Sequence, residues 1–226
     1  MARRIGQGMR DGNPSPELDW RDGTPVARRF DDPYFSLADG VEETRHVFLG
    51  GNDLPACLRA GFHIAELGFG TGLNALVLAK AWTGPGRLRF TSFEAWPMAR
   101  DDMARALAAF PALDATALLD QWPARRIALA GIDVEIVEGD ARRTLPVWHG
   151  RADAWFLDGF SPARNPEMWG AALLAEVARH TAPGGTFATY TAAGHVRASL
   201  AEAGFAVERR PGYGRKRHMT RGVLPG

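Results

Sequence analysis

The stretch "FHIAELGFGTGLNALVLAKAW", residues 62–82, decides the fold. A short apolar run, 62–67, ends on the glycine-rich turn "GFGTG", and an apolar segment of helical character, 75–82, follows. A strand, a glycine turn and a helix in this order are typical of the first unit of an open α/β sheet. The remainder of the chain repeats the same alternation, so we expect a largely parallel sheet covered by helices on both faces.

The alternation predicts seven strands and four main helices. The expected strands are 62–67, 88–95, 134–140, 152–158, 183–191, 205–210 and 218–224, and the expected helices are 75–82, 97–110, 166–180 and 194–204. No helix separates the last two strands, so the final strand is expected to enter the sheet antiparallel. The segment 26–51 reads as short strands and turns rather than as a long helix.

Length and composition indicate one globular domain. The chain has 226 residues, 46% of them hydrophobic and 23% charged, which is ordinary for a domain with a full core. We expect an irregular leader at 1–27, an N-terminal extension or lid at 28–60 and the α/β core at 61–226. The single cysteine, Cys57, and the absence of a signal peptide or an 18-residue apolar run favour a cytoplasmic, membrane-free protein.

The glycine loop distinguishes between classes of cofactor. A dinucleotide fingerprint requires glycine where Leu73 stands, and the loop here reads Gly68, Gly70, Gly72, preceded by Glu66. A carboxylate at this position repels a pyrophosphate but suits a cationic ligand. An NAD-dependent dehydrogenase is therefore disfavoured.

Further acids follow the predicted strands. Glu94 ends the second strand, at a place where acids commonly bind ribose hydroxyls, and Asp140 ends the third, within reach of an adenine amine. Asp158 ends the fourth strand. Because ligands bind outside the carboxyl ends of the strands in open α/β sheets, we expect these acids at one site. The six histidines show no metal-ligand spacing, so no metal is expected.

Charge is unevenly distributed along the chain. Residues 209–226 carry six basic and no acidic residues, whereas 1–208 carry 26 acidic and 21 basic residues. Such a cationic segment predicts contact with a nucleic acid or another phosphate, although a solvated tail has the same composition. The candidate RNA-binding residues are Arg209, Arg210, Tyr213, Arg215, Lys216 and Arg217.

Four ordered motifs give the sequence a specific resemblance. "FDDPYFSLADGVEETRHVFLGGN" (30–52), "ELGFGTGLN" (66–74), "FLDGFSPARNPEMW" (156–169) and "GYGRKRHM" (212–219) resemble the methyltransferase domain of bifunctional MnmC tRNA-modifying enzymes and stand-alone MnmC-like or MnmD-type relatives. The resemblance covers about residues 30–224. It implies the class I S-adenosylmethionine-dependent methyltransferase fold, here with a seven-stranded, mostly parallel Rossmann-like sheet and an antiparallel terminal strand.

The resemblance also implies an activity. Members of this family use S-adenosyl-L-methionine to methylate the aminomethyl group of 5-aminomethyl-2-thiouridine at the wobble position of tRNA. The implied cofactor-binding residues are Glu66, Gly68, Gly70, Gly72, Asn74, Glu94, Asp140 and Asp158. Asp158 is the expected catalytic residue because a carboxylate can orient the amine or accept its proton. Phe160 and Tyr34 are expected to line the substrate pocket.

The resemblance also implies binding partners, and two alternative functions stand beside it. The implied partner is a tRNA anticodon stem-loop, together with a separate FAD-dependent oxidase acting upstream, since no flavin domain is expected in this chain. We expect a monomer. A small-molecule amine N-methyltransferase, which has no need of the basic segment, and a non-catalytic RNA-binding module on the same fold remain alternatives; the second is disfavoured because all four acids are present.

Overall fold

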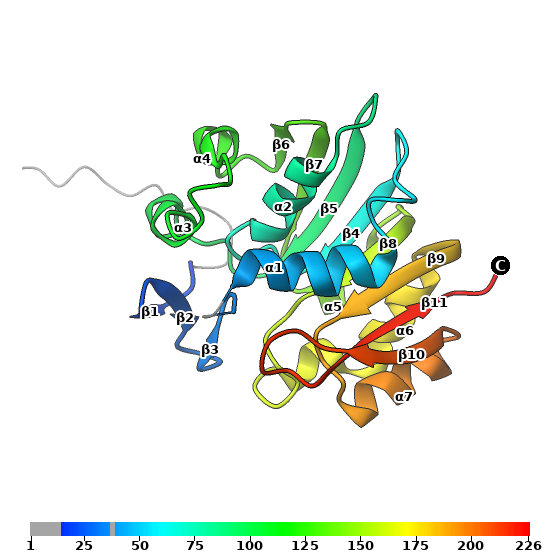
Figure 1. The fold of residues 1–226 in the computed structure, drawn as a ribbon. Helices are drawn as coiled ribbons and strands as arrows, with labels where there is room; N and C mark the ends of the chain where they lie inside the picture. The colour runs from blue at the N-terminus through cyan, green and yellow to red at the C-terminus, as the bar shows by residue number, and fades with distance from the viewer. Residues whose placement is uncertain (1–14, 37–38) are drawn as a thin grey trace, which may run out of the picture.

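A computed structural model of the protein describes residues 15–36 and 39–226. It contains an eight-stranded sheet, and Figure 1 shows helices in front of it and behind it. The strands occur in the order β10 (Ala206–Pro211), β11 (His218–Val223), β9 (Thr181–Thr189), β8 (Ala152–Leu157), β4 (His63–Leu67), β5 (Leu88–Glu94), β7 (Ile132–Glu138), β6 (Arg126–Leu129).

The five central strands, β9 to β7, are parallel, as the alternating pattern predicts. β11 is inserted between β9 and β10 and runs antiparallel to both, which confirms the expected direction of the final strand. The expectation of seven strands is wrong by one. β6 adds an antiparallel edge because a two-residue turn at Ala130 and Gly131 folds it onto β7.

Two hydrophobic clusters cover the two faces of the sheet. One packs α2 (Leu73–Ala81), α3 (Arg100–Leu107) and α4 (Thr116–Gln121) against one face. The other packs α6 (Ala171–Arg179) and α7 (Gly194–Glu202) against the opposite face. Three further helical turns are α5 (Ala141–Thr144), η3 (Leu145–Val147) and η4 (Pro166–Trp169).

No helix within 15–36 and 39–226 is long and apolar enough to span a membrane.

The N-terminal region differs from the sequence-based expectation in two places. Residues 1–14 of the expected leader lie outside the described residues, but its later part forms strands β1 (Leu18–Arg21) and β2 (Thr24–Ala27), which pair antiparallel. β3 (Asp32–Pro33) completes this small sheet, which lies at one end of the molecule near α3 (Figure 1).

Residues 40–52 form a continuous helical segment, so the expectation of strands and turns there is wrong. It consists of α1 (Gly40–Thr44), η1 (Arg45–Leu49) and η2 (Gly50–Asn52). The side chain of Asp39 caps it by accepting a hydrogen bond from the Glu42 amide. Burial of Val47, Phe48 and Leu49 against the sheet outweighs the poor helix propensity of the flanking glycines.

Candidate active site

A cavity of about 630 Å³ lies at the carboxyl ends of the parallel strands. Its wall is built from the segments that follow β4, β5, β7, β8 and β9, which is where open α/β sheets bind ligands. Residues of β3, α1 and the β10–β11 loop complete the lining, so parts far apart in the sequence meet here. Within the described residues no group of three or more His, Cys, Asp or Glu side chains is placed to hold a metal ion.

The glycine loop after β4 forms part of this wall. Gly68 and Gly70 have φ values of 91° and 54°, a backbone region that residues with a Cβ rarely adopt. A Cβ at Gly68 would collide with the carbonyl oxygen of Asp158, and one at Gly70 would lie 3.1 Å from the Tyr34 ring. The two glycines therefore let neighbouring segments approach closely. Gly72, also at positive φ, packs instead against Leu118 and does not line the cavity.

Glu94 braces the same loop from the end of β5. Its carboxylate accepts hydrogen bonds from the amides of Gly70 and Trp96, each at 2.8 Å. The side chain is buried, which raises the pKa of Glu94 above its ordinary value. Glu94 also lines the cavity, so its carboxylate lies where it can accept a hydrogen bond from a ligand hydroxyl.

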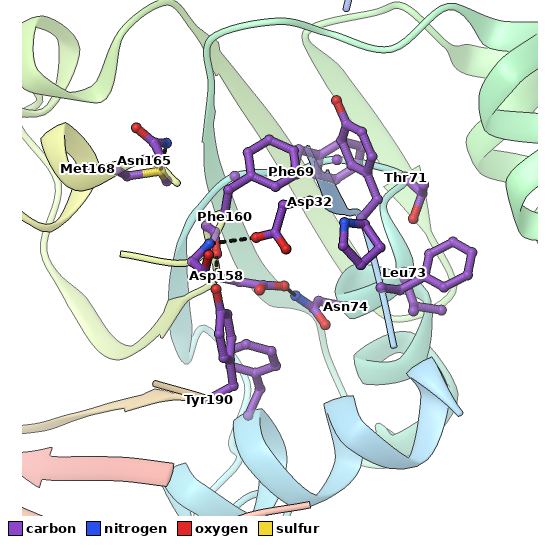
Figure 2. A pocket seen from close by; sticks show the side chains of 18 of the residues that line it. Asp32, Phe69, Thr71, Leu73, Asn74, Asp158, Phe160, Asn165, Met168 and Tyr190 are labelled. Atoms are coloured by element: carbon purple, nitrogen blue, oxygen red, sulfur yellow. Dashed lines mark hydrogen bonds between the residues drawn. The ribbon is translucent and has the colours of Figure 1, made fainter. Parts of the chain in front are cut away.

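Asn74, in the first turn of α2, connects two carboxylates. Its amide nitrogen donates to Glu66 at 2.9 Å and to Asp158 at 2.6 Å, while its oxygen accepts from the Thr44 hydroxyl at 2.7 Å. Figure 2 shows the Asn74 and Asp158 side chains pointing toward each other. Asn74 and Asp158 line the cavity, but Glu66 is fully buried behind them. The structure thus places Glu66 as a support for Asn74 rather than in the cavity wall.

Burial changes the acidity of both carboxyls. It raises the pKa of Glu66 to about 8, although Ser92, which donates to Glu66 at 2.6 Å, and Asn74 oppose the shift. Burial raises the pKa of Asp158 to about 7, with nearby Glu43 acting in the same direction. A carboxyl with a pKa near neutrality can exchange a proton at physiological pH, as acid–base catalysts do.

The loop after β8 is held at successive residues. The Tyr190 hydroxyl donates to the Gly159 carbonyl at 2.6 Å, and the Trp169 indole donates to the Phe160 carbonyl at 2.8 Å. The Ser161 amide donates to the Asp32 carboxylate at 2.7 Å, as drawn in Figure 2. Together with the bond from Asn74, these contacts fix the backbone on which Asp158 stands.

The N-terminal sheet packs onto this loop through aromatic rings. Phe30 stacks on Phe160 with centroids 4.7 Å apart, and Tyr34 meets Phe160 edge to face at 5.1 Å. Tyr34 and Phe160 both line the cavity. Burial raises the pKa of the Tyr34 hydroxyl, so this group stays neutral at physiological pH.

Asp140 caps α5 at the cavity edge. Its carboxylate accepts from the Arg142 guanidinium at 2.6 Å, which holds the pKa of Asp140 below its usual range. Arg142 also pairs with Glu167 at 2.8 Å. Asp140 lines the cavity, and its charge is compensated by Arg142.

The six candidate RNA-binding residues fall into two groups. Tyr213, Arg215 and Lys216 line the cavity from the loop between β10 and β11. The others, Arg209, Arg210 and Arg217, are exposed outside it.

Several cavity residues have no clear signal in the sequence. Tyr190 follows β9 and Asp32 lies in β3, and both hold the loop after β8. Asn165 and Met168, joined by an N–H···S contact of 3.5 Å, line the far side. Only the position of Tyr190, near the carboxyl end of the predicted strand 183–191, could have indicated its place at the site.

The cavity suits the cationic cofactor that the sequence predicts. Carboxylates of Glu43, Glu94, Asp140 and Asp158 surround it, and the glycine loop leaves room for close backbone approach. Positively charged sulfonium and amino groups would be stabilised here, whereas a pyrophosphate would be repelled. The residues present therefore fit S-adenosyl-L-methionine.

Comparison with known proteins agrees with this chemistry. Two similar proteins are named tRNA 5-methylaminomethyl-2-thiouridine biosynthesis bifunctional protein MnmC. The one from Caulobacter sp. strain K31 is 49% identical over 239 residues, which cover 96% of this chain and 40% of the relative. The one from Pseudomonas aeruginosa strain UCBPP-PA14 is 48% identical over 229 residues, covering 93% and 35%. The chain thus spans about 40% or less of the length of these relatives.

Solved structures share the architecture. MNMC2 from Aquifex aeolicus superposes with a TM-score of 0.73 at 25% identity, covering 96% of this chain and 74% of that one. A methyltransferase from Pyrococcus furiosus, with a TM-score of 0.54 at 16% identity over 93% and 90% of the two chains, shows the fold alone. A family model matches residues 112–225, half of the chain, and by it the chain belongs to the S-adenosyl-L-methionine-dependent methyltransferases.

Proposed function

We propose that this protein methylates the primary amine of 5-aminomethyl-2-thiouridine at the wobble position of tRNA, giving 5-methylaminomethyl-2-thiouridine. The observation that carries the proposal is the Asp158 carboxyl, fixed by Asn74 beside the glycine loop and facing the cavity. The names of the MnmC relatives, which belong to the biosynthesis of this nucleoside, support the choice of substrate.

The reaction requires a neutral amine. S-adenosyl-L-methionine supplies an electrophilic methyl group on a sulfonium. The amine lone pair forms the new C–N bond, the methyl–sulfur electron pair stays on sulfur, and one proton leaves the nitrogen. An alkylamine is mostly protonated near pH 7, with a reference pKa of about 10.4 for lysine. Asp158, whose pKa is raised to about 7, is a far better proton acceptor than an ordinary aspartate.

The other cavity residues position the reactants. Gly68, Gly70 and Asn74 would hold the methionine part of the cofactor, and Glu94 and Asp140 its nucleoside part. Phe160 and Tyr34 would enclose the uracil base, with residues 28–60 acting as a lid. Orientation of this kind supplies much of the rate enhancement in a simple displacement.

The basic segment would bind the anticodon stem-loop. Arginines bind phosphates through forked hydrogen bonds, and Tyr213 offers a face on which an unpaired base can stack. In the same proposal the protein acts as a monomer in the cytoplasm, and a separate FAD-dependent oxidase generates the amine.

The test is methyl transfer to tRNA from cells that lack this modification, followed by mass analysis of the nucleosides. We expect Asp158→Asn and Asp158→Ala to lower kcat at least a hundredfold, with cofactor affinity within a few-fold of wild type. Since the carboxylate form is needed, kcat/KM of the wild type should rise with pH through about 7, and this limb should vanish in Asp158→Asn.

Asp120→Asn is the matched control, because Asp120 is exposed on α4 and does not line the cavity. It should leave both rate and pH profile unchanged. Near-normal turnover by a folded Asp158→Ala variant would remove Asp158 from the mechanism. Absence of methylated nucleoside with the wild-type protein would reject the substrate.

A further inference from the structure

A lysine ammonium of the chain itself occupies the cavity mouth. The Lys216 Nζ lies 2.8 Å from the Glu43 carboxylate and 3.8 Å from the centroid of the Tyr190 ring. The three residues come from the β10–β11 loop, α1 and the end of β9, and all three line the cavity. The Glu43 side chain is only 11% exposed, whereas that of Lys216 is 43% exposed.

This ammonium lies beside the proposed proton acceptor. The Tyr190 hydroxyl donates to the carbonyl of Gly159, the residue next to Asp158 (Figure 2). Burial raises the pKa of Asp158, and Lys216 is close enough to oppose this rise; burial also raises the pKa of Tyr190, and Asp158 and Glu43 act in the same direction. Glu43, Tyr190 and Asp158 thus surround one small region of the cavity.

The surroundings have the composition of an alkylammonium site. An aromatic face attracts a cation at this distance, and a largely buried carboxylate supplies the counter-charge. Lys216 approaches from an exposed loop with the solvent-facing Arg215 and Arg217 as neighbours. The Lys216 side chain is 43% exposed, so its ammonium regains contact with water when it leaves, and a substrate ammonium in its place restores the counter-charge of Glu43.

We propose that Glu43 and the ring of Tyr190 form the subsite that binds the substrate amine as an ammonium ion, and that Lys216 fills this subsite until the substrate displaces it. The inference rests on the proposed function, since the substrate amine is the ligand in question. Glu43 and Tyr190 thereby become residues that select a cationic wobble side chain. An unmodified uridine has no group to replace the Lys216 ammonium, so Glu43 would lose its partner on binding it.

The first experiment uses butylammonium as a probe and needs no enzymatic turnover. Lys216→Ala empties the subsite, so we expect butylammonium to bind this variant in an NMR titration at least tenfold more tightly than it binds wild type. Adding Glu43→Gln to Lys216→Ala should abolish the gain. Lys80→Ala is the matched control, because Lys80 is the other lysine of the chain and bonds the Ala112 carbonyl away from the cavity. Equal binding by wild type and by Lys216→Ala would overturn the subsite.

The second experiment uses tRNA carrying the aminomethyl group and the same tRNA with unmodified uridine. We expect Glu43→Gln to raise KM for the aminomethyl tRNA at least tenfold, with a much smaller change in kcat and no change in binding of the unmodified tRNA. Tyr190→Phe, which keeps the ring, should preserve KM better than Tyr190→Leu.

The two proposals fail in different ways. If the wild type methylates tRNA but Glu43→Gln keeps the wild-type KM, the subsite is wrong and the proposed function stands. If the wild type transfers no methyl group to tRNA, the proposed function is wrong, and the butylammonium titration still decides whether Glu43 and Tyr190 bind an ammonium ion.

Discussion

Asn74 does more to organise the site than any glycine of the neighbouring loop. Its single amide group bonds Thr44 of α1, Glu66 of β4 and Asp158 after β8, and so joins three elements. A carboxylate buried without such a donor would be strongly destabilised. The sequence motif predicts that Asn74 binds the cofactor, and its hydrogen bonds show that it also holds the Asp158 carboxyl, the proposed proton acceptor.

The backbone at Gly68 strongly restricts substitution. We expect Gly68→Ala to destabilise the protein by at least about 1 kcal/mol, because its φ is 91° and the new Cβ would collide with the Asp158 carbonyl. Displacing Asp158 by about 1 Å can lower turnover roughly a hundredfold. Urea denaturation and methyl transfer measure the two effects.

Gly194→Ala is the control for this substitution. Gly194 begins α7, and a Cβ there meets nothing within 4 Å. It should leave stability and turnover close to wild type. Wild-type turnover by Gly68→Ala would show that the Asp158 loop tolerates displacement.

At the scale of elements, the central strands were predictable and the N-terminal elements were not. Strands β4, β5 and β8 are recognisable in the sequence as apolar runs that end in glycines or acids. The helical segment 40–52 contains three glycines, and what stabilises it is distant in sequence. The Asn52 side chain, for example, donates to the Trp155 carbonyl of β8. Local propensity carries no information about such contacts.

Topology also decides which residues of the candidate site could be placed from the sequence. Residues at the ends of strands or directly after them, such as Glu94 and Asp158, could be placed because topology alone brings strand ends together. The sequence places Glu66 in the right region, yet only the structure shows that its side chain is buried behind Asn74. Asp32 could not be placed, since its bond to Ser161 depends on how the small N-terminal sheet packs.

The β10–β11 loop offers a test of RNA binding that leaves the ammonium subsite intact. We expect Arg215→Ala combined with Arg217→Ala to weaken tRNA binding and to flatten its dependence on salt. Each lost phosphate contact lowers the slope of log K against log salt by about 0.7 to 0.9. Binding titrations at several salt concentrations provide the measurement.

Arg126→Ala serves as the control for the loop variant. Arg126 is an exposed arginine of β6, at the opposite edge of the sheet from β10. Its replacement should leave the salt dependence unchanged. An unaltered slope in the loop double variant would place the RNA-binding surface elsewhere.

For the whole molecule, the buried acids in and behind the cavity wall lower the stability of the folded protein when they are ionised. A site that binds a cation is built from carboxylates, and in the free protein these lie close together with few positive partners. Burial and mutual repulsion then favour their protonated forms. The cost appears as a dependence of the unfolding free energy on pH.

Glu66 contributes such a dependence of the unfolding free energy on pH. Its pKa is raised from 4.5 to about 8, so between these values the folded protein binds a proton that the unfolded chain has lost. The unfolding free energy should therefore fall as pH rises across this window, by at most about 1.4 kcal/mol per pH unit. Glu66→Gln removes this pH dependence because an amide does not titrate. The hydrogen bond to Ser92 can be kept, since the Ser92 hydroxyl can accept from the new amide.

We expect Glu66→Gln to gain stability relative to wild type steadily between pH 5 and pH 8. Urea denaturation at several pH values measures the difference, and Glu202→Gln, at the exposed end of α7, is the matched control. Parallel pH curves for wild type and Glu66→Gln would show that Glu66 is ionised in the folded protein. Since S-adenosyl-L-methionine is a cation, its addition should also stabilise the wild type more at pH 8 than at pH 5, where the Asp158 carboxyl, with a pKa raised to about 7, is protonated.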